Sequence, residues 1–293
     1  MVNNMRRILL TISYDGTDYS GWQVQKDPDI RTVQGELNKA CTKLFKTEIM
    51  SIGASRTDAG VHAVGQRAVI DVDTSIPTEK IHLAINSFLP NDVVIVCAED
   101  VSGDFNPRFQ AERKIYEYRI YNNPVRNPIC RNYSEYVREK LDIKKMSEAA
   151  EAFIGEHDFK GFCSSGNSSK TTVRTIYEMT VQRDGDFVVI RVIGNGFLYN
   201  MVRIIAGTLI PTGISAIFEI TLDSPIPAIT PIIPPILVNT TASVKNCPKM
   251  LRFFAPTAFF NPISLVLSVT DTSIIFITPI PPTSKEILAI QIN

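Results

Sequence analysis

The sequence predicts an α+β fold in two halves, with the boundary between residues 100 and 112. Segments with the two-residue period of strands alternate with segments that have the 3.6-residue period of helices, and a second series begins near residue 114. A chain of 293 residues is long enough for about two domains. Thirty basic residues balance thirty acidic ones and 44% of the residues are hydrophobic, so the chain is neither a disulfide scaffold nor wholly disordered.

In the first half, three strands are expected to alternate with two helices. Residues 8–14 alternate as a strand that ends at the turn pair Asp15-Gly16, and the apolar positions of residues 32–46 fall on one helical face. The remaining strands are expected at 69–72 and 93–98, and a second helix at 78–88, where Pro90 ends it.

The second half has the same kinds of signal. Strands are expected at 114–121, 173–181 and 187–193, and helices at 143–154 and 197–209. The turn Arg183-Asp184-Gly185 predicts that the last two strands pair antiparallel. In the strand expected at 114–121, Tyr116 and Tyr118 fall on one face because strand side chains alternate.

Residues 209–293 differ in composition from the rest. They hold 12 of the 18 prolines but only 8 of the 60 charged residues, with one glycine and no helical period. Glu219, Asp223, Asp271 and the prolines together interrupt every window long enough to span a membrane. The tail is therefore interpreted as short strands with proline-broken connections, as a poorly packed extension, or as the product of a shifted reading frame. We expect low order and an exposed apolar patch in it.

The cysteines and the N-terminus indicate a cytoplasmic protein. The five cysteines are odd in number, scattered and never spaced as Cys-x-x-Cys, which favours reduced thiols and no zinc site. The N-terminus lacks the apolar core of a signal peptide.

The densest chemical signal is the polar loop at residues 55–63, Ser-Arg-Thr-Asp-Ala-Gly-Val-His-Ala. An isolated Asp-Ala-Gly is most often an ordinary turn. Here Arg56 supplies a cation that favours an ionised Asp58, and Gly60 permits close approach, which suits a nucleophilic aspartate. His62 has no acid, base or second ligand near it in sequence, so we assign it no catalytic role.

Arg-Thr-Asp-Ala-Gly-Val-His-Ala closely resembles the signature of the TruA family of tRNA pseudouridine synthases. Further similar segments follow the family's order and spacing at 14–23, 105–122, 157–162 and 196–209, so that the resemblance covers nearly all of residues 5–208. It implies two related α+β domains with antiparallel-rich mixed sheets flanked by helices, and an active-site cleft between them. The domains would be 1–105, which carries the catalytic loop, and 106–208, which binds RNA and completes the site; the atypical tail is 209–293.

The resemblance also implies roles for individual residues. Asp58 becomes the catalytic residue; whether it attacks ribose C1′ or uracil C6, or helps to remove a ribose proton, stays open. Tyr116 becomes the platform for the flipped base, against the alternative of a core aromatic, which we keep for Tyr118. Arg203 becomes the partner of Asp58 and a phosphate contact, against the alternative of a solvated helix edge. Arg56 has a neighbouring role in substrate binding. The reaction needs no metal and no cofactor.

A basic strip at residues 106–131 suggests RNA binding, since six cations face two acids there with tyrosines between them. The residues assigned to RNA are Arg108, Arg113, Lys114 and Arg126, while Arg119 and Arg131 are compatible with a solvated strand face. The resemblance implies tRNA as the partner, uridines 38 to 40 of the anticodon stem-loop as targets, and a homodimer without a membrane association.

The end of the chain departs from the family. Members continue with a polar helix and an Ala-Pro-x-x-Gly-Leu-x-Leu strand beside the site, whereas the nearest fragment here, at 255–258, lacks the Gly-Leu. A missing strand would leave a sheet edge exposed. An alternative function is therefore a catalytically impaired RNA-binding relative with a damaged or frameshifted end. An aspartate-based glycoside hydrolase is disfavoured, because no second carboxylate is marked.

Overall fold

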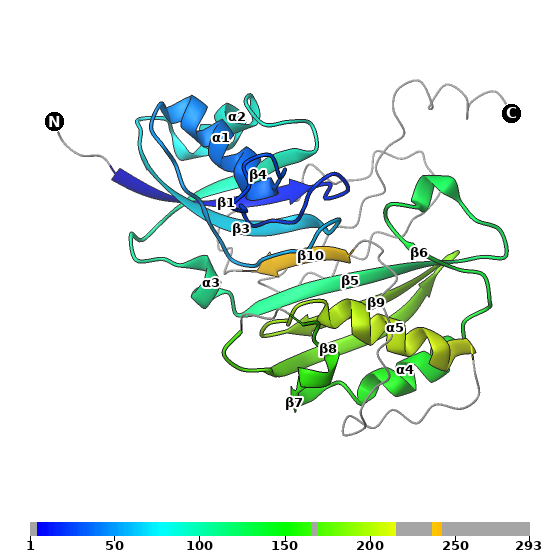
Figure 1. Ribbon diagram of the computed structural model, residues 1–293. Helices are drawn as coiled ribbons and strands as arrows, with labels where there is room; N and C mark the ends of the chain where they lie inside the picture. Colours follow the sequence, from blue (N-terminus) through cyan, green and yellow to red (C-terminus); the bar gives the residue numbers. More distant parts are fainter. Residues whose placement is uncertain (1–4, 166–168, 215–235, 242–293) are drawn as a thin grey trace, which may run out of the picture.

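The computed structural model describes residues 5–165, 169–214 and 236–241 of the chain (Figure 1). The strands are β1 (Met5–Tyr14), β2 (Ile52–Gly53), β3 (His62–Asp73), β4 (Val93–Val101), β5 (Arg113–Asn122), β6 (Glu135–Val137), β7 (Gly155–Asp158), β8 (Val173–Asp184), β9 (Phe187–Gly194) and β10 (Ile236–Thr241). The helices are α1 (Val33–Phe45), α2 (Thr78–Asn86), α3 (Pro107–Gln110), α4 (Ile143–Glu151) and α5 (Met201–Ile214), with short 3₁₀ helices η1 (Pro128–Cys130) and η2 (Phe159–Phe162).

The strands form a mixed sheet that contains two antiparallel groups. The first group has the order β4-β1-β3 and the second has the order β5-β9-β8-β7. Between them lies β10, which pairs parallel to β3 and antiparallel to β5 (Figure 1). The predicted α+β fold with antiparallel-rich mixed sheets is confirmed, and the two groups are joined edge to edge through β10.

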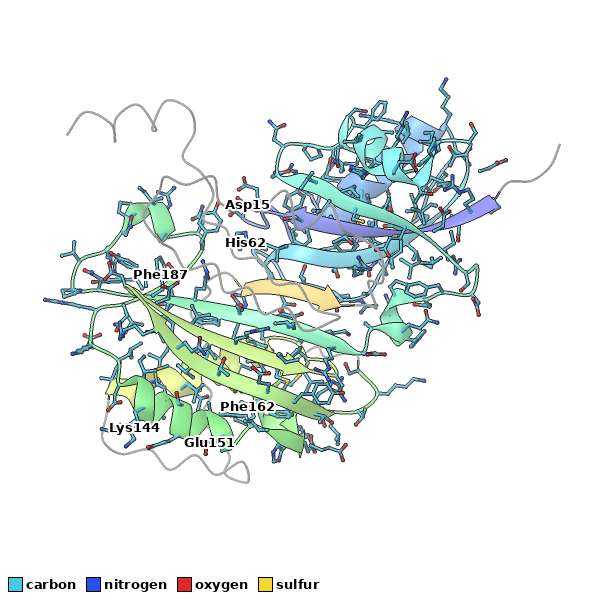
Figure 2. All side chains as sticks on the ribbon, turned by 180° about the vertical axis from the view of Figure 1, so that it is seen from behind. Asp15, His62, Lys144, Glu151, Phe162 and Phe187 are labelled. Atoms are coloured by element: carbon cyan, nitrogen blue, oxygen red, sulfur yellow. The ribbon has the colours of Figure 1, made fainter. Side chains whose placement is uncertain are left out.

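Each strand group has its own helices. In Figure 1, α1 and α2 lie over the first group, and α4 and α5 lie over the second. The Thr32 side chain caps α1 by accepting a hydrogen bond from the Gly35 N–H, and Asp142 caps α4 in the same way. Figure 2 shows the molecule from behind, with Lys144 and Glu151 of α4 far from Asp15, which follows β1, and from His62 at the start of β3.

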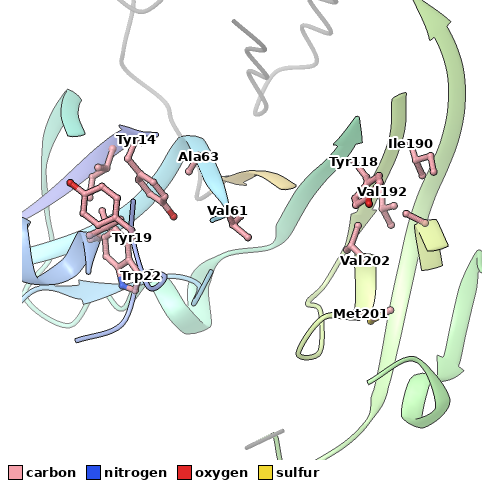
Figure 3. Packing of buried hydrophobic residues seen from close by; sticks show 14 of the residues in the cluster. Tyr14, Tyr19, Trp22, Val61, Ala63, Tyr118, Ile190, Val192, Met201 and Val202 are labelled. Atoms are coloured by element: carbon pink, nitrogen blue, oxygen red, sulfur yellow. The ribbon is translucent and has the colours of Figure 1, made fainter. Parts of the chain in front are cut away.

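One apolar cluster contains buried residues of both halves. Figure 3 shows Tyr14 and Trp22 in the first half and Tyr118 and Val192 in the second. Tyr118 is only 3% exposed, which confirms its interpretation as a core aromatic. Burial of such side chains is the main force that holds each strand group against its helices.

Every strand and helix expected from periodicity is present, and the differences are at element ends. The strand expected at 69–72 extends back to His62 because that segment is buried on both faces and so shows no alternation. The helix expected from residue 197 begins at Met201, because Asn200 has φ 58° and is left-handed. Residues 195–200 form a loop instead, and this loop reaches the candidate site described below.

The described part of the tail consists of the end of α5, which continues past Pro211 to Ile214, and of β10. The interpretation of the tail as short strands therefore holds at 236–241. The concern about an exposed sheet edge does not apply between β3 and β5, because β10 pairs with both. The expectations of low order and an exposed apolar patch fall largely on residues 215–235 and 242–293, which lie outside the described residues.

Two further expectations concern the cysteines and membranes. Cys41, Cys130 and Cys163 are free thiols, as expected for reduced cysteines, while Cys247 lies outside the described residues. Within the described ranges, no helix is long and apolar enough to cross a membrane.

Candidate active site

The loop between β2 and β3 carries Asp58 and is held by the segment that follows β1. The Thr57 carbonyl accepts a hydrogen bond of 3.0 Å from the Trp22 N–H. The two segments pass so closely that a Cβ on Gly21 would lie 2.5 Å from the Thr57 carbonyl oxygen. Gly60 has φ +73°, a conformation that favours glycine. These contacts fix the position of the Asp58 backbone.

A cavity of about 730 Å³ opens beside this loop and is lined from both halves of the chain. The first half contributes the loop residues Ala54, Ser55, Arg56 and Asp58. The second half, with its linker, contributes Arg108, Lys114, Tyr116, Ser169, Thr171, Val173, Arg174 and the run from Asn195 to Val202. A cavity of this size accommodates a nucleoside and neighbouring groups. Five of the predicted site residues therefore line one cavity.

Asp58 lines this cavity, and Arg203, which is not among the lining residues, acts on Asp58 through its positive charge. Burial raises the pKa of the Asp58 carboxyl, while the positive charge of Arg203 and a hydrogen bond from the Asn200 N–H lower it. Arg203 on α5 is 4% exposed, and its Nη2 donates a 3.1 Å hydrogen bond to the Ala59 carbonyl. Its Nε has no hydrogen-bond partner within the described part of the chain. Arg203 thus couples α5 to the Asp58 loop and is not a solvated helix edge.

Tyr116 lies on β5 and lines the cavity, half-buried. Its ring meets the ring of Phe197 edge to face, with 4.7 Å between centroids. Burial raises the pKa of the Tyr116 hydroxyl, and the negative charge of Asp58 raises it further. The phenol therefore stays protonated at neutral pH, and its ring is held in place for stacking.

The structure divides the predicted RNA-binding residues into two sets. Arg108 and Lys114 line the cavity together with Arg56. Arg113 and Arg126 do not line it: Arg113 lies over the ring of Tyr177 at 5.6 Å, and Arg126 lies over the ring of Tyr136 at 5.0 Å. The sequence strip is therefore not one continuous wall of the cavity.

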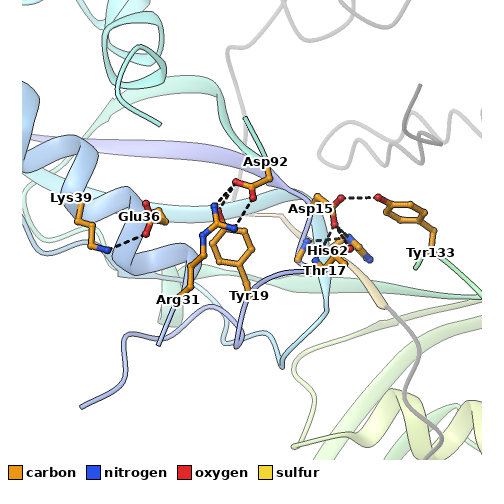
Figure 4. A network of polar contacts seen from close by, with 10 residues as sticks. Asp15, Thr17, Tyr19, Arg31, Glu36, Lys39, His62, Asp92 and Tyr133 are labelled. Carbon is orange, nitrogen blue, oxygen red and sulfur yellow. Dashed lines mark hydrogen bonds and ion pairs between the residues drawn. The ribbon is translucent and has the colours of Figure 1, made fainter. Parts of the chain in front are cut away.

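His62 lies at the other end of the Asp58 loop and belongs to a different network (Figure 4). Its Nδ1 is 2.9 Å from Asp15 Oδ1, and its Nε2 is 2.9 Å from the Asn132 carbonyl oxygen in the second half. The His62 ring lies 4.9 Å from the ring of Tyr133, whose hydroxyl donates a 2.7 Å hydrogen bond to Asp15 Oδ2. His62 is not among the residues that line the cavity.

Sequence reasoning missed several residues that line the cavity, notably Arg174 of β8 and the loop from Asn195 to Asn200. The signal for the loop was Gly-Asn-Gly between strand and helix patterns, which marks a turn. Arg174 carried no local signal, since it reaches the cavity only through the pairing of β8 with β9.

Within the described ranges, no group of three or more His, Cys, Asp or Glu side chains is arranged to hold a metal ion. The chemical groups that line the cavity are instead one carboxylate, four cations, the phenols of Tyr116 and Tyr199, and the hydroxyl and amide side chains of Ser55, Ser169, Thr171, Asn195 and Asn200. This set suits acid–base or nucleophilic chemistry on an anionic substrate.

Comparisons with known proteins agree with this arrangement. The sequence model of the tRNA pseudouridine synthase family matches residues 10–110 and 149–219. The chain is 50% identical over 210 residues to tRNA pseudouridine synthase A 2 of Clostridium tetani, covering 72% of this chain and 85% of that protein. It is 49% identical over 216 residues to tRNA pseudouridine synthase A of Ruminiclostridium cellulolyticum, covering 73% and 87%. The chain belongs to the tRNA pseudouridine synthase family.

Proposed function

We propose that this chain isomerises uridine to pseudouridine in tRNA, with Asp58 as the catalytic residue. The observation that carries the proposal is the half-buried Asp58 carboxylate, whose charge is balanced by Arg203, in a cavity that also presents the Tyr116 ring. The substrate class follows from the family, whose relatives are named tRNA pseudouridine synthases.

The reaction breaks the bond between uracil N1 and ribose C1′ and forms a bond between C5 and C1′. The proton on C5 is lost and N1 gains one, so that atoms balance without an oxidant or a second substrate. Asp58 acts either as a nucleophile at C1′ or C6 or as a base on the ribose, and all three roles require the ionised carboxylate. Arg203 keeps that ionised form accessible against the effect of burial.

Tyr116 is proposed as the platform on which the target base rests after it leaves its stack. Its hydroxyl lies in the field of Asp58 and stays protonated, so it assists removal of the C5 proton only as a relay that gives up its own proton as it takes the other. Arg203, Arg56 and the basic residues of the cavity would bind the adjoining backbone of the RNA.

The finer features of the substrate follow the family resemblance. We propose that the targets are uridines 38 to 40 of the anticodon stem-loop and that the enzyme is a cytoplasmic homodimer. Residues 1–105 would carry the catalytic loop, and residues 106–208 would bind RNA through Arg108, Arg113, Lys114 and Arg126. Arg113 and Arg126 lie away from the cavity, so they would contact RNA beyond the target nucleotide.

A second candidate is an RNA-binding relative with impaired catalysis. It is favoured by the tail, because the family match ends at residue 219 and does not extend over the remaining residues. The described tail nevertheless supplies β10 beside both β3 and β5.

One experiment separates the two candidates. Purified full-length chain is incubated with unmodified tRNA transcripts, and pseudouridine is mapped by carbodiimide labelling. Pseudouridine at positions 38 to 40 that disappears with Asp58→Asn supports the enzyme. Tight tRNA binding without any pseudouridine supports the impaired relative.

A further inference from the structure

The cavity contains more positive charge than its catalytic centre needs. Among the described residues that line it, Asp58 is the single carboxylate and Arg56, Arg108, Lys114 and Arg174 are the cations. Lys114 on β5 and Arg174 on β8 are half-buried, and Arg108 on α3 is exposed. Three of these four cations come from outside the Asp58 loop and have no part in the chemistry described above.

Arg108, Lys114 and Arg174 lie close to one another. Burial lowers the pKa of the Lys114 ammonium, and the positive charges of Arg174 and Arg108 lower it further. Like charges in a partly buried place repel one another, and an anion bound among them would remove that cost.

Arg174 is held in a fixed orientation. Its Nη1 donates hydrogen bonds of 2.9 Å and 2.6 Å to the carbonyls of Thr171 and Val173. The turn after β9 passes close to the same side chain, since a Cβ on Gly196 would lie 3.5 Å from Arg174 Nε. Among the described residues these bonds use only Nη1 of the guanidinium, which leaves Nη2 for a ligand, as in the forked contacts that arginine makes with phosphate.

The strand register relates these cations to the base platform. Lys114 and Tyr116 are two residues apart on β5, so they share a face with about 7 Å between them. Gly194 of β9 pairs with Lys114 on one side and with Ile176 on the other, which places Arg174, two residues before Ile176, at the same end of the sheet. In a nucleotide the phosphate is separated from its base by one ribose, a similar span.

We propose that Arg108, Lys114 and Arg174 form a subsite for one phosphodiester of the RNA backbone, next to the nucleoside that rests on Tyr116. This inference rests on the proposed function, because it takes RNA as the anion. It assigns to Arg174 a role in binding rather than in chemistry.

The test measures the dissociation constant of the full chain for unmodified tRNA from 50 to 300 mM KCl. Each phosphate contact that is lost reduces the slope of log K against log [salt] by about 0.7 to 1. We expect this reduction for Arg174→Gln, and an unchanged slope for Arg174→Lys, which keeps the charge. The matched control is Arg138→Gln, an exposed arginine outside the cavity, which should leave the slope unchanged.

A second arm locates the phosphate. An anticodon stem-loop RNA carries a neutral methylphosphonate at one phosphate beside the target uridine, and binding is measured with wild type and with Arg174→Lys. At one phosphate, the methylphosphonate should weaken RNA binding by wild type and by Arg174→Lys several-fold. The same methylphosphonate should weaken binding by Arg174→Gln less, because the neutral phosphonate and the Gln substitution remove the same contact.

Three outcomes overturn the inference. The first is a wild-type salt slope in Arg174→Gln, and the second is an equal reduction of the slope in Arg174→Gln and Arg174→Lys while both melting temperatures match wild type. The third is that a methylphosphonate at no position weakens binding by wild type. Failure of the proposed function can be told apart from failure of this inference. In that case the wild-type chain makes no pseudouridine, whatever its affinity for tRNA.

Discussion

The Asp58 loop meets the second half of the molecule at two places, and these two junctions are built differently. At the His62 end, polar groups satisfy one another: Asp15 accepts from Tyr133 and Thr17, and His62 lies within hydrogen-bond distance of Asp15 (Figure 4). At the Asp58 end, Arg203 Nε lacks a partner within the described residues, and burial disfavours the charge on both Asp58 and Arg203.

The difference indicates what each junction does. A satisfied network of hydrogen bonds holds two segments together and leaves nothing for a substrate. Buried charged side chains with unsatisfied hydrogen-bond donors reduce the stability of the fold. They are typical of functional sites, where a bound ligand supplies the missing hydrogen-bond partner.

Asp58→Asn should reduce pseudouridine formation on the order of 10³-fold or more, because an amide is a poor nucleophile and a poor base. The affinity for tRNA should stay within a few-fold of wild type. Single-turnover assays on unmodified tRNA, with filter binding as the control, measure the two quantities. Substantial turnover by this variant would remove Asp58 from the mechanism.

The same substitution should not destabilise the fold. Because burial raises the pKa of Asp58, the carboxyl contributes stability below its unfolded pKa of about 4, and this contribution is lost as the pH rises through the folded pKa. At pH 7 the Asn variant should therefore be as stable as wild type or more stable, measured by urea unfolding. A large loss of stability would show that Asp58 supports the fold.

Arg203→Gln should lower turnover at neutral pH about 10²-fold and move the acid limb of the pH–rate profile to higher pH. The reason is that the positive charge of Arg203 lowers the pKa of Asp58, whose ionised form is the reactive one. Arg203→Lys keeps the positive charge, so its acid limb should lie close to that of wild type. A limb that stays in place in both variants would mean that Arg203 acts only through its contact with the Ala59 carbonyl.

Tyr116→Ala should weaken tRNA binding by about 1–3 kcal/mol, since it removes the stacking ring, whereas Tyr116→Phe should keep the affinity. If the hydroxyl also moves a proton, the Phe variant binds normally but turns over slowly. Comparison of KM and kcat for the two variants separates stacking from proton transfer. Full turnover by the Ala variant would exclude both roles.

The contrast between the junctions also marks what the sequence predicts well. The Asp58 loop is a local feature, since a dense polar motif and Gly60 lie within nine residues, and the positions of Tyr116 and Lys114 follow from strand alternation. These residues line the cavity as expected.

Long-range pairings are not visible in the sequence. Arg174 reaches the cavity only because β8 pairs with β9, and His62 contacts Asn132 across seventy residues. Arg113 and Arg126 were grouped with Lys114 by sequence distance, yet stacking on tyrosines takes them elsewhere. The place of β10 between β3 and β5 was equally hidden, because proline-rich composition masks a short strand.

The smallest effect is expected at the His62 junction, for Tyr133→Phe. This change removes the hydrogen bond to Asp15 but keeps the ring that lies against His62, so it should lower the free energy of unfolding by about 1–2 kcal/mol and leave kcat unchanged at 20 °C.

Burial opposes ionisation of Asp15, but hydrogen bonds from His62, Thr17 and Tyr133 outweigh it and hold the pKa of Asp15 well below its usual range. A carboxyl with a depressed pKa contributes stability above its unfolded pKa of about 4 and loses it as the pH falls through the folded value. The difference between Tyr133→Phe and wild type should therefore be full at pH 7 and narrow below pH 4, which urea unfolding at several pH values measures. A variant that keeps its stability but loses kcat would place this junction in the catalytic machinery and end the contrast between the two ends of the loop.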